Sequence, residues 1–322
     1  MSNKHTAADL KQLQSMPLEL KIRATKMRIE QWYDHWEGMV YVSFSGGKDS
    51  TVLKHIVDSM YDDVPSLFVD TGLEYPEIRR FAASQKNVTV VRPEMRFDEV
   101  LKKHGYPVIG KEQAQYIYEY RHTTSENMRN RRLNGDSRGR FKISNKWAKV
   151  IDAPFEVHKK CCDVMKKRPA AKFEKETRRK PIIGTMTEES SLRKNSWIKY
   201  GCNVFDTGKP SSQPLSFWTE QDILEYIDTY KIPYCREIYG EIIHDENGYH
   251  TTGASRTGCI FCGFGCHLEK EPNRFQELKK THPKQWNYCI NGGEYDENGI
   301  WRPSKEGLGM CKVLDYIGVN YE

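Results

Sequence analysis

The sequence predicts an α/β fold, a doubly wound parallel sheet with helices on both faces, followed by a cysteine-rich C-terminal portion. Short apolar segments rich in β-branched and aromatic residues alternate with segments of helical period. A glycine turn, Ser45–Ser50, joins the first such strand to its helix. Glycines and cysteines then accumulate over residues 233–270, which favours loop structure there.

Each element rests on a local pattern. Strands are expected at 39–44, 66–70, 88–91 and 181–184, and helices at 17–36, 50–60, from 76, 97–104, 162–179, 220–230, 273–280 and 308–317. Pro76 suits a first helical turn, and Thr219 is a plausible N-cap. Residues 1–15 are expected to be loose, and residues 106–150 interrupt the alternation of strands and helices.

The turn Ser45–Ser50, of sequence Ser-Gly-Gly-Lys-Asp-Ser, is predicted to bind phosphate. Its two glycines let backbone N–H groups approach an anion, and the following helix start and Lys48 add positive charge. Asp49 occupies the place where a Walker A loop needs a hydroxyl residue, so this turn is a different phosphate loop.

Four segments together resemble the motifs of the phosphoadenosine phosphosulfate (PAPS) reductase family and of the PP-loop ATP pyrophosphatases, whose fold is adenine nucleotide alpha-hydrolase-like. They are the turn at 45–50, Asp-Thr-Gly at 70–72, Gly-x-x-x-x-Glu-Ser-x-x-Arg at 184–193, and Pro-Leu-x-x-Trp-Thr-x-x-Asp at 214–222. The resemblance covers roughly residues 40–240.

The resemblance implies that the chain binds an adenine nucleotide, either ATP or a sulfonucleotide. The candidate nucleotide-binding residues are Ser45, Gly46, Gly47, Lys48, Asp49, Ser50, Asp70, Thr71, Gly72, Gly184, Glu189 and Ser190. The candidate catalytic residues are Lys48, Asp49, Arg193 and Cys266. Lys48 and Arg193 would stabilise charge that develops on the phosphates, and Asp49 is a candidate ligand of Mg²⁺.

The cysteines form a set with metal-ligand spacing. Cys259, Cys262 and Cys266 follow a C-x-x-C-x-x-x-C pattern, and Cys161 and Cys162 could supply a fourth ligand. Zinc and iron–sulfur clusters both accept four thiolates. The set resembles the [4Fe–4S] site of adenylyl-sulfate reductases, which favours a cluster and leaves zinc as the alternative.

Five cysteines exceed the four ligands that such a centre needs, so either Cys161 lies outside the first coordination shell or Cys266 is available for chemistry. The other cysteines, which belong to no motif, are expected to be buried and free: Cys202, Cys235, Cys289 and Cys311. The sequence lacks the Glu-Cys-Gly-Leu-His type of motif that carries the attacking cysteine of sulfonucleotide reductases.

Positive charge is concentrated in one part of the chain. Residues 121–180 contain 19 Lys or Arg against 7 Asp or Glu, whereas the whole chain has a net charge of +6. Over 106–150 these cations are interleaved with aromatic residues, namely Tyr116, Tyr118, Tyr120, Phe141 and Trp147. The pattern suits contact with single-stranded RNA or DNA, and equally a lid over a nucleotide.

The sequence predicts three parts: an N-terminal helical segment (1–38), a PP-loop domain (39–235) with a basic insertion at 106–150, and a cysteine-rich C-terminal region (236–322). The N-terminus lacks an apolar signal core and no apolar run could span a membrane, which predicts a cytoplasmic protein.

Three functions remain open. The first is ATP-dependent adenylation coupled to sulfur transfer, with nucleic acid as one potential acceptor and with a sulfur donor or reductant as a partner. The second is a sulfonucleotide reductase that releases sulfite from APS or PAPS. The third is a nucleic-acid-binding protein gated by a nucleotide.

Overall fold

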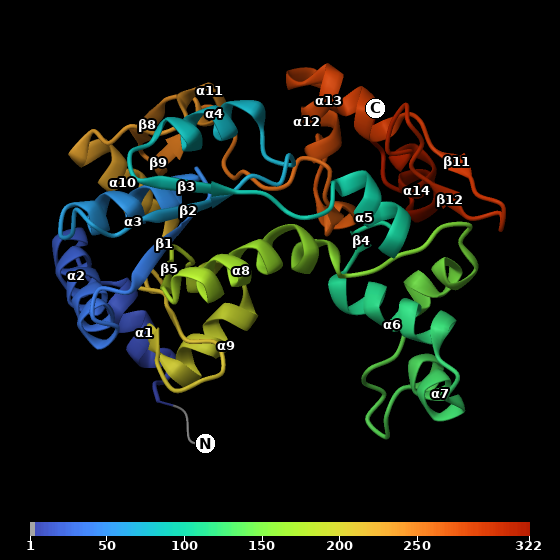
Figure 1. The fold of residues 1–322 in the computed structure, drawn as a ribbon, viewed down its shortest axis with the longest axis horizontal. Coiled ribbons are helices and arrows are strands. Elements are labelled where there is room, and N and C mark those ends of the chain that lie inside the picture. The colour runs from blue at the N-terminus through green and yellow to red at the C-terminus, as the bar shows by residue number, and fades with distance from the viewer. Residues whose placement is uncertain (1–3) are drawn as a thin grey trace. The chain divides into compact units, whose positions relative to one another are not determined.

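The computed structural model describes residues 4–322, and these residues form two compact units (Figure 1). Unit 1 comprises the described residues up to Asp70 together with Glu74–Arg92 and Pro169–Thr257. Unit 2 comprises Thr71–Leu73, Pro93–Arg168 and Gly258–Glu322. The three-part division expected from the sequence stays a prediction.

Unit 1 is built on a six-stranded sheet of order β3-β2-β1-β5-β7-β6. Its strands are β1 (Val40–Phe44), β2 (Ser66–Val69), β3 (Val88–Val91), β5 (Lys180–Ile183), β6 (Asn203–Val204) and β7 (Ser211–Ser212). The central strand β1 pairs in parallel with β2 and with β5, whereas β6 runs antiparallel to β7. The predicted α/β class and the mainly parallel sheet are confirmed.

Helices surround this sheet, and a β-hairpin follows them. The helices are α1 (Ala7–Gln14), α2 (Leu18–His35), α3 (Lys48–Asp58), α4 (Pro76–Ser84), α8 (Arg168–Thr177), α9 (Ser191–Tyr200), α10 (Glu220–Tyr230) and α11 (Arg236–Tyr239). The hairpin consists of β8 (Ile242–Asp245) and β9 (Gly248–Thr251).

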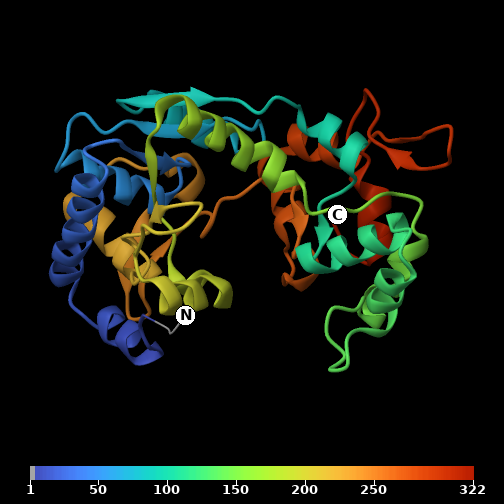
Figure 2. The ribbon, with the colours of Figure 1, turned by 60° about the horizontal axis from the view of Figure 1, so that its bottom comes forward.

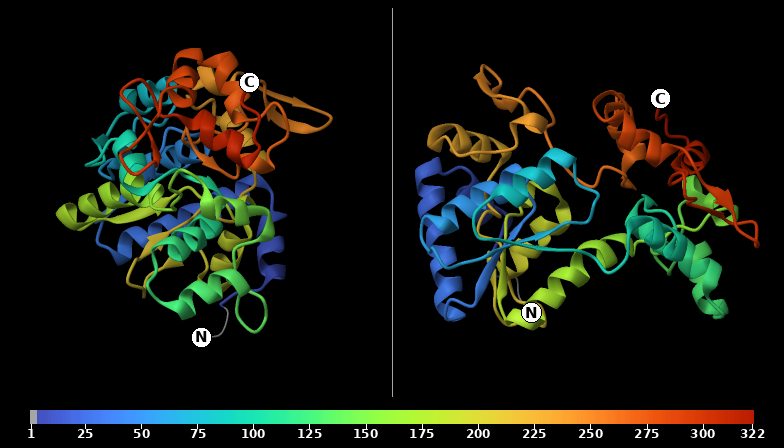
Figure 3. Two further views of the ribbon diagram at one scale, coloured as in Figure 1. Left: turned by 90° about the vertical axis from the view of Figure 1, so that its right-hand side faces the viewer. Right: turned by 45° about the horizontal axis from the view of Figure 1, so that its top comes forward.

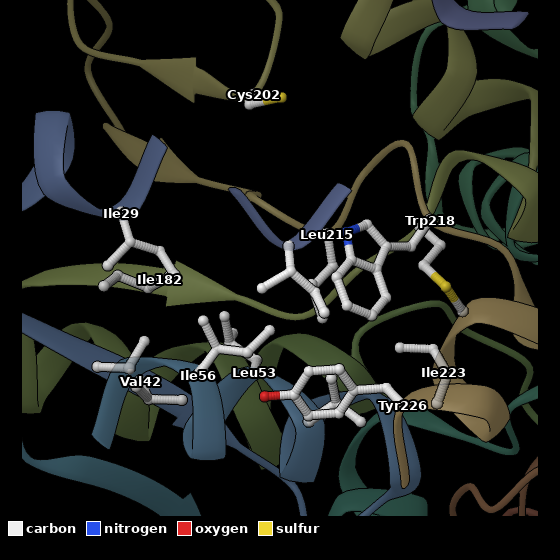
Figure 4. Close-up of a cluster of buried hydrophobic side chains, with 14 of the residues drawn as sticks. Ile29, Val42, Leu53, Ile56, Ile182, Cys202, Leu215, Trp218, Ile223 and Tyr226 are labelled. Carbon is white, nitrogen blue, oxygen red and sulfur yellow. The ribbon is translucent and has the colours of Figure 1, made fainter. Parts of the chain in front are cut away.

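Alternate residues of β1 face opposite sides of the sheet, as the two-residue period of a strand requires. Val40 and Val42 belong to a large core cluster with side chains from α2, α3 and α10, and Figure 4 shows part of it around Trp218. Tyr41 instead packs with Phe173 of α8 on the other face. Helices therefore cover both faces, as expected for a doubly wound sheet.

A buried ion pair fixes the start of α10. The ammonium group of Lys21, in α2, lies 2.7 Å from both carboxylate oxygens of Asp222, and both side chains are less than 10% exposed. Asp222 also accepts hydrogen bonds from the N–H and the hydroxyl of Thr219, which completes a capping box. The predicted N-cap Thr219 is confirmed, and α2 holds the first turn of α10 in place.

Unit 2 is mostly helical. Its α-helices are α5 (Phe97–His104), α6 (Lys111–His122), α7 (Glu126–Asn134), α12 (Arg274–Thr281), α13 (Pro283–Ile290) and α14 (Met310–Ile317), joined by a 3₁₀ helix (Asn145–Asp152) and a π-helix (Asp163–Lys167). Helices α6 and α7, drawn in green, lie side by side (Figure 2). Strands β4 (Val108–Ile109) and β10 (Gly263–Phe264) pair in parallel, and β11 (Glu294–Tyr295) and β12 (Trp301–Arg302) form a hairpin, drawn in red (Figure 3).

Two expectations about secondary structure were wrong, and one helix, α13, was not predicted. The N-terminal residues contain α1, which begins at a capping box between Thr6 and Asp9. Residues 233–270 contain the β8–β9 hairpin, whose turn includes Asn247 before Gly248 at φ +93°. Helix α13 begins with Pro283, a residue suited to a first helical turn. Each signal is local and was present in the sequence.

Across the described residues, 4–322, no helix combines the length and the apolar composition that a membrane crossing requires.

Candidate functional site

The turn between β1 and α3 forms the predicted phosphate loop. Gly46 has φ +74°, and a Cβ atom there would lie 3.0 Å from Cγ2 of Ile78 and 3.1 Å from its carbonyl oxygen. The Ser50 hydroxyl donates to the carbonyl of Gly47 at 3.0 Å and accepts from the N–H of Ser45 at 3.2 Å. The loop is therefore closed by its own side chains, and α3 begins directly after Gly47.

The loop forms one wall of a cavity of about 680 Å³, here called the unit 1 cavity. This volume is within the range of small-molecule sites, roughly 300–1,000 Å³. The predicted residues that line it are Ser45, Gly47, Lys48, Asp49, Ser50, Gly184, Glu189 and Arg193. A Cβ atom on Gly184 would lie 3.2 Å from the carbonyl oxygen of Asp49, so a glycine allows the two loops to approach closely.

The other predicted binding residues do not line this cavity. Gly46 lies within the turn before α3, and the Ser190 hydroxyl accepts a hydrogen bond from the N–H of Arg193 at the start of α9. The buried Asp70 pairs with Arg79 at 2.7 and 2.9 Å and with Arg92 at 3.2 Å. Within unit 1 it therefore anchors α4 to the end of β3. Thr71 and Gly72 belong to unit 2, and their nucleotide-binding role stays a prediction.

Lys48 is paired with a carboxylate across the cavity. Its ammonium group lies 2.6 Å from Oε1 of Glu220, and its side chain is only 5% exposed. Glu220 stands at the first position of α10, and its N–H donates to Glu188 at 2.6 Å. The ring of Tyr239 lies 5.5 Å from the same ammonium group. Glu220 and Tyr239 thus hold the ammonium group of Lys48 in position at the cavity wall.

Glu189 holds the other two cations of the cavity. One of its carboxylate oxygens pairs with Arg193 and the other pairs with Arg256. The N–H of Met186 also donates to this carboxylate at 3.0 Å. Arg193 was predicted from its motif, whereas Arg256 was missed. The small polar run around Arg256, Thr-Gly-Ala-Ser-Arg-Thr-Gly, was interpreted only as a loop before the cysteines.

Carboxylates outnumber cations around the cavity, with Asp49, Glu188, Glu189 and Glu220 facing Lys48, Arg193 and Arg256. Burial raises the pKa of Asp49 to about 6, and the carboxylates of Glu189 and Glu220 act in the same direction against Lys48 and Arg256. Burial also raises the pKa of Glu188. A polyanion would therefore bind best with a proton or a metal ion to offset these carboxylates.

The five predicted metal-ligand cysteines all lie in unit 2. Burial, followed by the neighbouring thiols of Cys162, Cys259 and Cys262, raises the pKa of Cys161 well above its ordinary value. A nearby cation is what such a group of buried thiols would need in order to ionise. Within residues 4–322 no group of three or more His, Cys, Asp or Glu side chains stands at metal-ligand spacing.

Cys266 is almost fully buried, and its thiol donates a hydrogen bond to the Gly263 carbonyl oxygen at 3.0 Å. Burial raises its pKa to about 11. Of the cysteines outside the motifs, Cys202, Cys235 and Cys289 are buried, as predicted. The prediction was wrong for Cys311, which is only partly buried in the first turn of α14.

The basic segment contains two kinds of arginine. Arg121 donates to four backbone carbonyl groups, and the buried Arg132 lies 4.1 Å from the Tyr116 ring and pairs with Glu119. These two arginines hold α6, α7 and the following 3₁₀ helix together. The arginines of residues 106–150 that remain exposed are Arg129, Arg131, Arg138 and Arg140, and the exposed lysines of the same stretch are Lys111, Lys142, Lys146 and Lys149. Arg131 and Arg140 lie 4.5 and 5.2 Å from the exposed ring of Phe141.

Comparison with known proteins agrees with the motifs. Residues 39–109 and 110–262 match the sequence model of the phosphoadenosine phosphosulfate reductase domain. Two uncharacterized proteins of Methanocaldococcus jannaschii are each 24% identical to the chain, over 85% and 91% of its length. The chain spans 48% and 62% of the length of these relatives.

Among solved structures, a phosphate complex of phosphoadenylyl-sulfate (PAPS) reductase from Candida auris is similar, with a TM-score of 0.39 and 16% identity. That similarity covers 74% of this chain and 93% of the reductase chain. The family match extends over most of the sequence and includes the phosphate loop and Arg256. The chain therefore belongs to the phosphoadenosine phosphosulfate reductase domain family of PP-loop proteins.

Proposed function

We propose that the protein is a PP-loop enzyme that binds ATP with Mg²⁺ in the unit 1 cavity and adenylates an acceptor, in a reaction coupled to sulfur transfer. In this proposal the cysteine set of unit 2 holds a [4Fe–4S] cluster, with zinc as the alternative. RNA or DNA is the proposed acceptor, and a sulfur donor or reductant is a further partner.

The observation that carries the proposal is the charge of the unit 1 cavity. Four carboxylates and three cations line it, and each of the three cations is paired with a carboxylate. The phosphates of a nucleotide would draw the three cations away from their carboxylate partners. A divalent cation bound to the nucleotide would then balance the negative charge of these carboxylates. ATP normally carries Mg²⁺ on its phosphates, and Mg²⁺ typically uses one or two carboxylates together with phosphate oxygens. Asp49, at the start of α3, is the proposed carboxylate ligand.

The proposed chemical step is an in-line displacement. An oxygen of the acceptor attacks the α-phosphorus, the bond from that phosphorus to the bridging oxygen breaks, and pyrophosphate leaves. Lys48 and Arg193 would exchange their carboxylate partners for phosphate oxygens and stabilise the charge that develops there. Tyr239 and Thr257, hydrogen-bonded to each other at 2.7 Å, would close the cavity floor beneath Lys48.

The cysteine set would serve the sulfur-transfer stage. An iron–sulfur centre can bind or activate sulfur, or transfer electrons. Four of the five cysteines Cys161, Cys162, Cys259, Cys262 and Cys266 are the proposed ligands, because burial and, after it, neighbouring thiols of this set raise the pKa of Cys161, Cys262 and Cys266. One cysteine of the five would not be a ligand; if it is Cys266, its burial means that it would need activation before it could act as a nucleophile.

The test is product analysis on anaerobically purified protein. With Mg²⁺ and ATP we expect pyrophosphate release that increases when RNA or DNA is added. Gly47→Val should abolish it, because a branched side chain there would press against the Tyr239 hydroxyl, 3.4 Å from an added Cβ atom. ATP turnover that no nucleic acid stimulates, in protein with a full complement of iron, would contradict the proposed acceptor.

The family description supports a second candidate, a sulfonucleotide reductase. In that reaction a cysteine thiolate attacks the sulfate sulfur, the bond from that sulfur to the bridging phosphate oxygen breaks, and the nucleotide phosphate leaves. A thiol reductant then attacks the S-sulfonated cysteine, which forms a disulfide and releases sulfite. The partly buried Cys311, in the first turn of α14, and Cys266 are the cysteines to test. Sulfite release from APS or PAPS that is lost in Cys311→Ser or Cys266→Ser would favour this candidate over adenylation.

A further inference from the structure

Unit 2 contains a cavity of about 580 Å³, here called the lysine cavity. Lys111, Gln115 and Tyr118 reach it from one face of α6, since they are spaced by about one helical turn. Lys159 and Lys160 come from the loop before Cys161, and Lys167 comes from the π-helix that follows. Four ammonium-bearing side chains, from three separate segments, therefore line one cavity.

These four lysines have no carboxylate partner among residues 4–322. Lys111 lies 5.6 Å from the ring of Phe264, and no ion pair to an Asp or Glu is formed by any of the four. One carboxylate, that of Asp163, also lines the cavity, and the guanidinium of Arg168 holds it at 3.1 Å. The unit 1 cavity shows the opposite arrangement, since a carboxylate pairs with each of its cations.

The remaining polar side chains of the wall are Gln115, Tyr118, His158 and Cys162, the last of which also belongs to the proposed metal-ligand set. His158 is 4% exposed, and its Nδ1 accepts the N–H of Lys160 at 2.9 Å, so its own proton is on Nε2. Burial, followed by Lys160 and other neighbouring positive groups, lowers the pKa of His158 to about 4, which keeps the ring neutral. The ring of Tyr118 packs against it, with centroids 4.1 Å apart.

The position of α6 adds to the positive potential. Lys111 is the first residue of this 12-residue helix, whose N-terminal end carries a partial positive charge. Lysine side chains act as compact point charges with three donors each, which suits a small tetrahedral dianion. The volume is sufficient for more than a bare ion, because sites of roughly 300–1,000 Å³ bind small molecules.

We propose that the lysine cavity binds the dianionic phosphate group of a ligand of up to nucleotide size, or inorganic sulfate. The ligand group would supply the negative charge that Lys111, Lys159, Lys160 and Lys167 lack, and Tyr118 would border the attached organic part. All lining residues belong to unit 2. The proposal therefore does not depend on the nucleotide assigned to the unit 1 cavity.

The experiment is lysine footprinting on the full chain. Brief acetylation under single-hit conditions, followed by peptide mass spectrometry, reports each lysine separately. Sulfate, phosphate, 5′-AMP and a short single-stranded oligonucleotide without terminal phosphate are added in separate arms. We expect sulfate, phosphate and 5′-AMP to slow acetylation of Lys159, Lys160 and Lys167 at least threefold. The exposed Lys284 and Lys305, also in unit 2, are the internal controls.

Paired variants then test the cause. Lys160→Gln with Lys167→Gln should raise the sulfate concentration that half-protects Lys159 by about tenfold or more, since charge-assisted contacts are lost. Lys284→Gln with Lys305→Gln removes the same charge and should leave that concentration unchanged. Circular dichroism of both variants verifies folding.

Three outcomes would overturn the proposal. The first is that the cavity lysines are acetylated at the same rate with and without each of the three small anions. The second is that the anions protect Lys284 and Lys305 as much as they protect the cavity lysines. The third is that only the oligonucleotide protects the cavity lysines. The last result would indicate a surface that binds the sugar–phosphate backbone of a nucleic acid rather than a site for a dianion. Acetylation is measured at each lysine separately. A failure of nucleotide binding in the unit 1 cavity can therefore be distinguished from a failure of anion binding in the lysine cavity.

Discussion

Replacing Asp49 by Asn should make the protein more stable at neutral pH while it impairs nucleotide binding. The carboxyl group of Asp49 is partly buried at the start of α3, and burial raises its pKa from 3.8 to about 6, with Glu189 and Glu220 adding to the effect. Asn has nearly the same shape and no charge. The substitution therefore removes the cost of an ionised group without opening a cavity.

The magnitude follows from the pKa difference. A rise of about two units, at roughly 1.4 kcal/mol each, means that the ionised carboxylate costs the folded state about 3 kcal/mol. The unfolded chain loses this proton near pH 3.8, whereas the folded chain retains it up to about pH 6. The stability contributed by this group therefore falls as the pH rises from about 4 to 6. We expect Asp49→Asn to gain up to about 3 kcal/mol at pH 7.5 and almost nothing near pH 4.

Urea denaturation at several pH values measures the effect, and hydrogen–deuterium exchange of α3 peptides assigns the change to unit 1. Asp228→Asn is the matched control. The carboxylate of Asp228 is exposed and pairs with the exposed Lys231, so we expect a change within about 0.5 kcal/mol. A stability gain that is the same at pH 4.5 and 7.5, or no gain at pH 7.5, would refute the reasoning.

Three further predictions address the phosphate loop, the metal and the basic surface. Gly46→Ala should weaken ATP binding about tenfold or more in calorimetry, because the residue has φ +74° and an added Cβ atom would press on Ile78. Anaerobically prepared protein should contain about four irons per chain by elemental analysis, and Cys259→Ser should lose them. Oligonucleotide affinity should depend less steeply on salt, with ATP binding unchanged, after charge reversal at Arg129, Arg131 and Arg138.

Each of these predictions has a control in the same chain. Gly208→Ala faces open space and should leave ATP binding unchanged. Cys235→Ser, outside the cysteine set, should keep the iron, and zinc in place of iron in the native preparation would contradict the cluster. Reversing Lys270, Lys284 and Lys305 instead should not alter the salt dependence. Arg132 is unsuitable for such a test because it is buried against Glu119, so its reversal would disrupt the fold.

Residue patterns predicted most of unit 1. Strand β3 and helix α10 have the predicted bounds, and Thr219 caps α10. Periodicity and capping act within a few residues, so they can be recognised in a sequence. The phosphate loop was likewise found from contiguous residues, Ser45–Ser50.

What the sequence could not predict are the pairings between distant residues. The contact of Lys48 with Glu220 joins residues 172 positions apart, and the contact of Arg256 with Glu189 joins residues 67 apart. Periodicity contains no information about such pairs. The loop sequence therefore did not reveal that carboxylates outnumber cations around the cavity. The lysine cavity was hidden for the same reason, since its three segments meet only in the fold.

The buried pair of Lys21 and Asp222 has a consequence for the smallest piece of this chain that can function. The family match begins at residue 39, and α2 ends before it. A fragment cut at that boundary would lose Lys21 and leave Asp222 as an unpaired carboxylate beneath the first turn of α10. That turn carries Glu220, the partner of Lys48. We expect Lys48 to be misplaced in such a fragment, so helix α2 is part of the structural unit that positions the phosphate loop rather than an appendage.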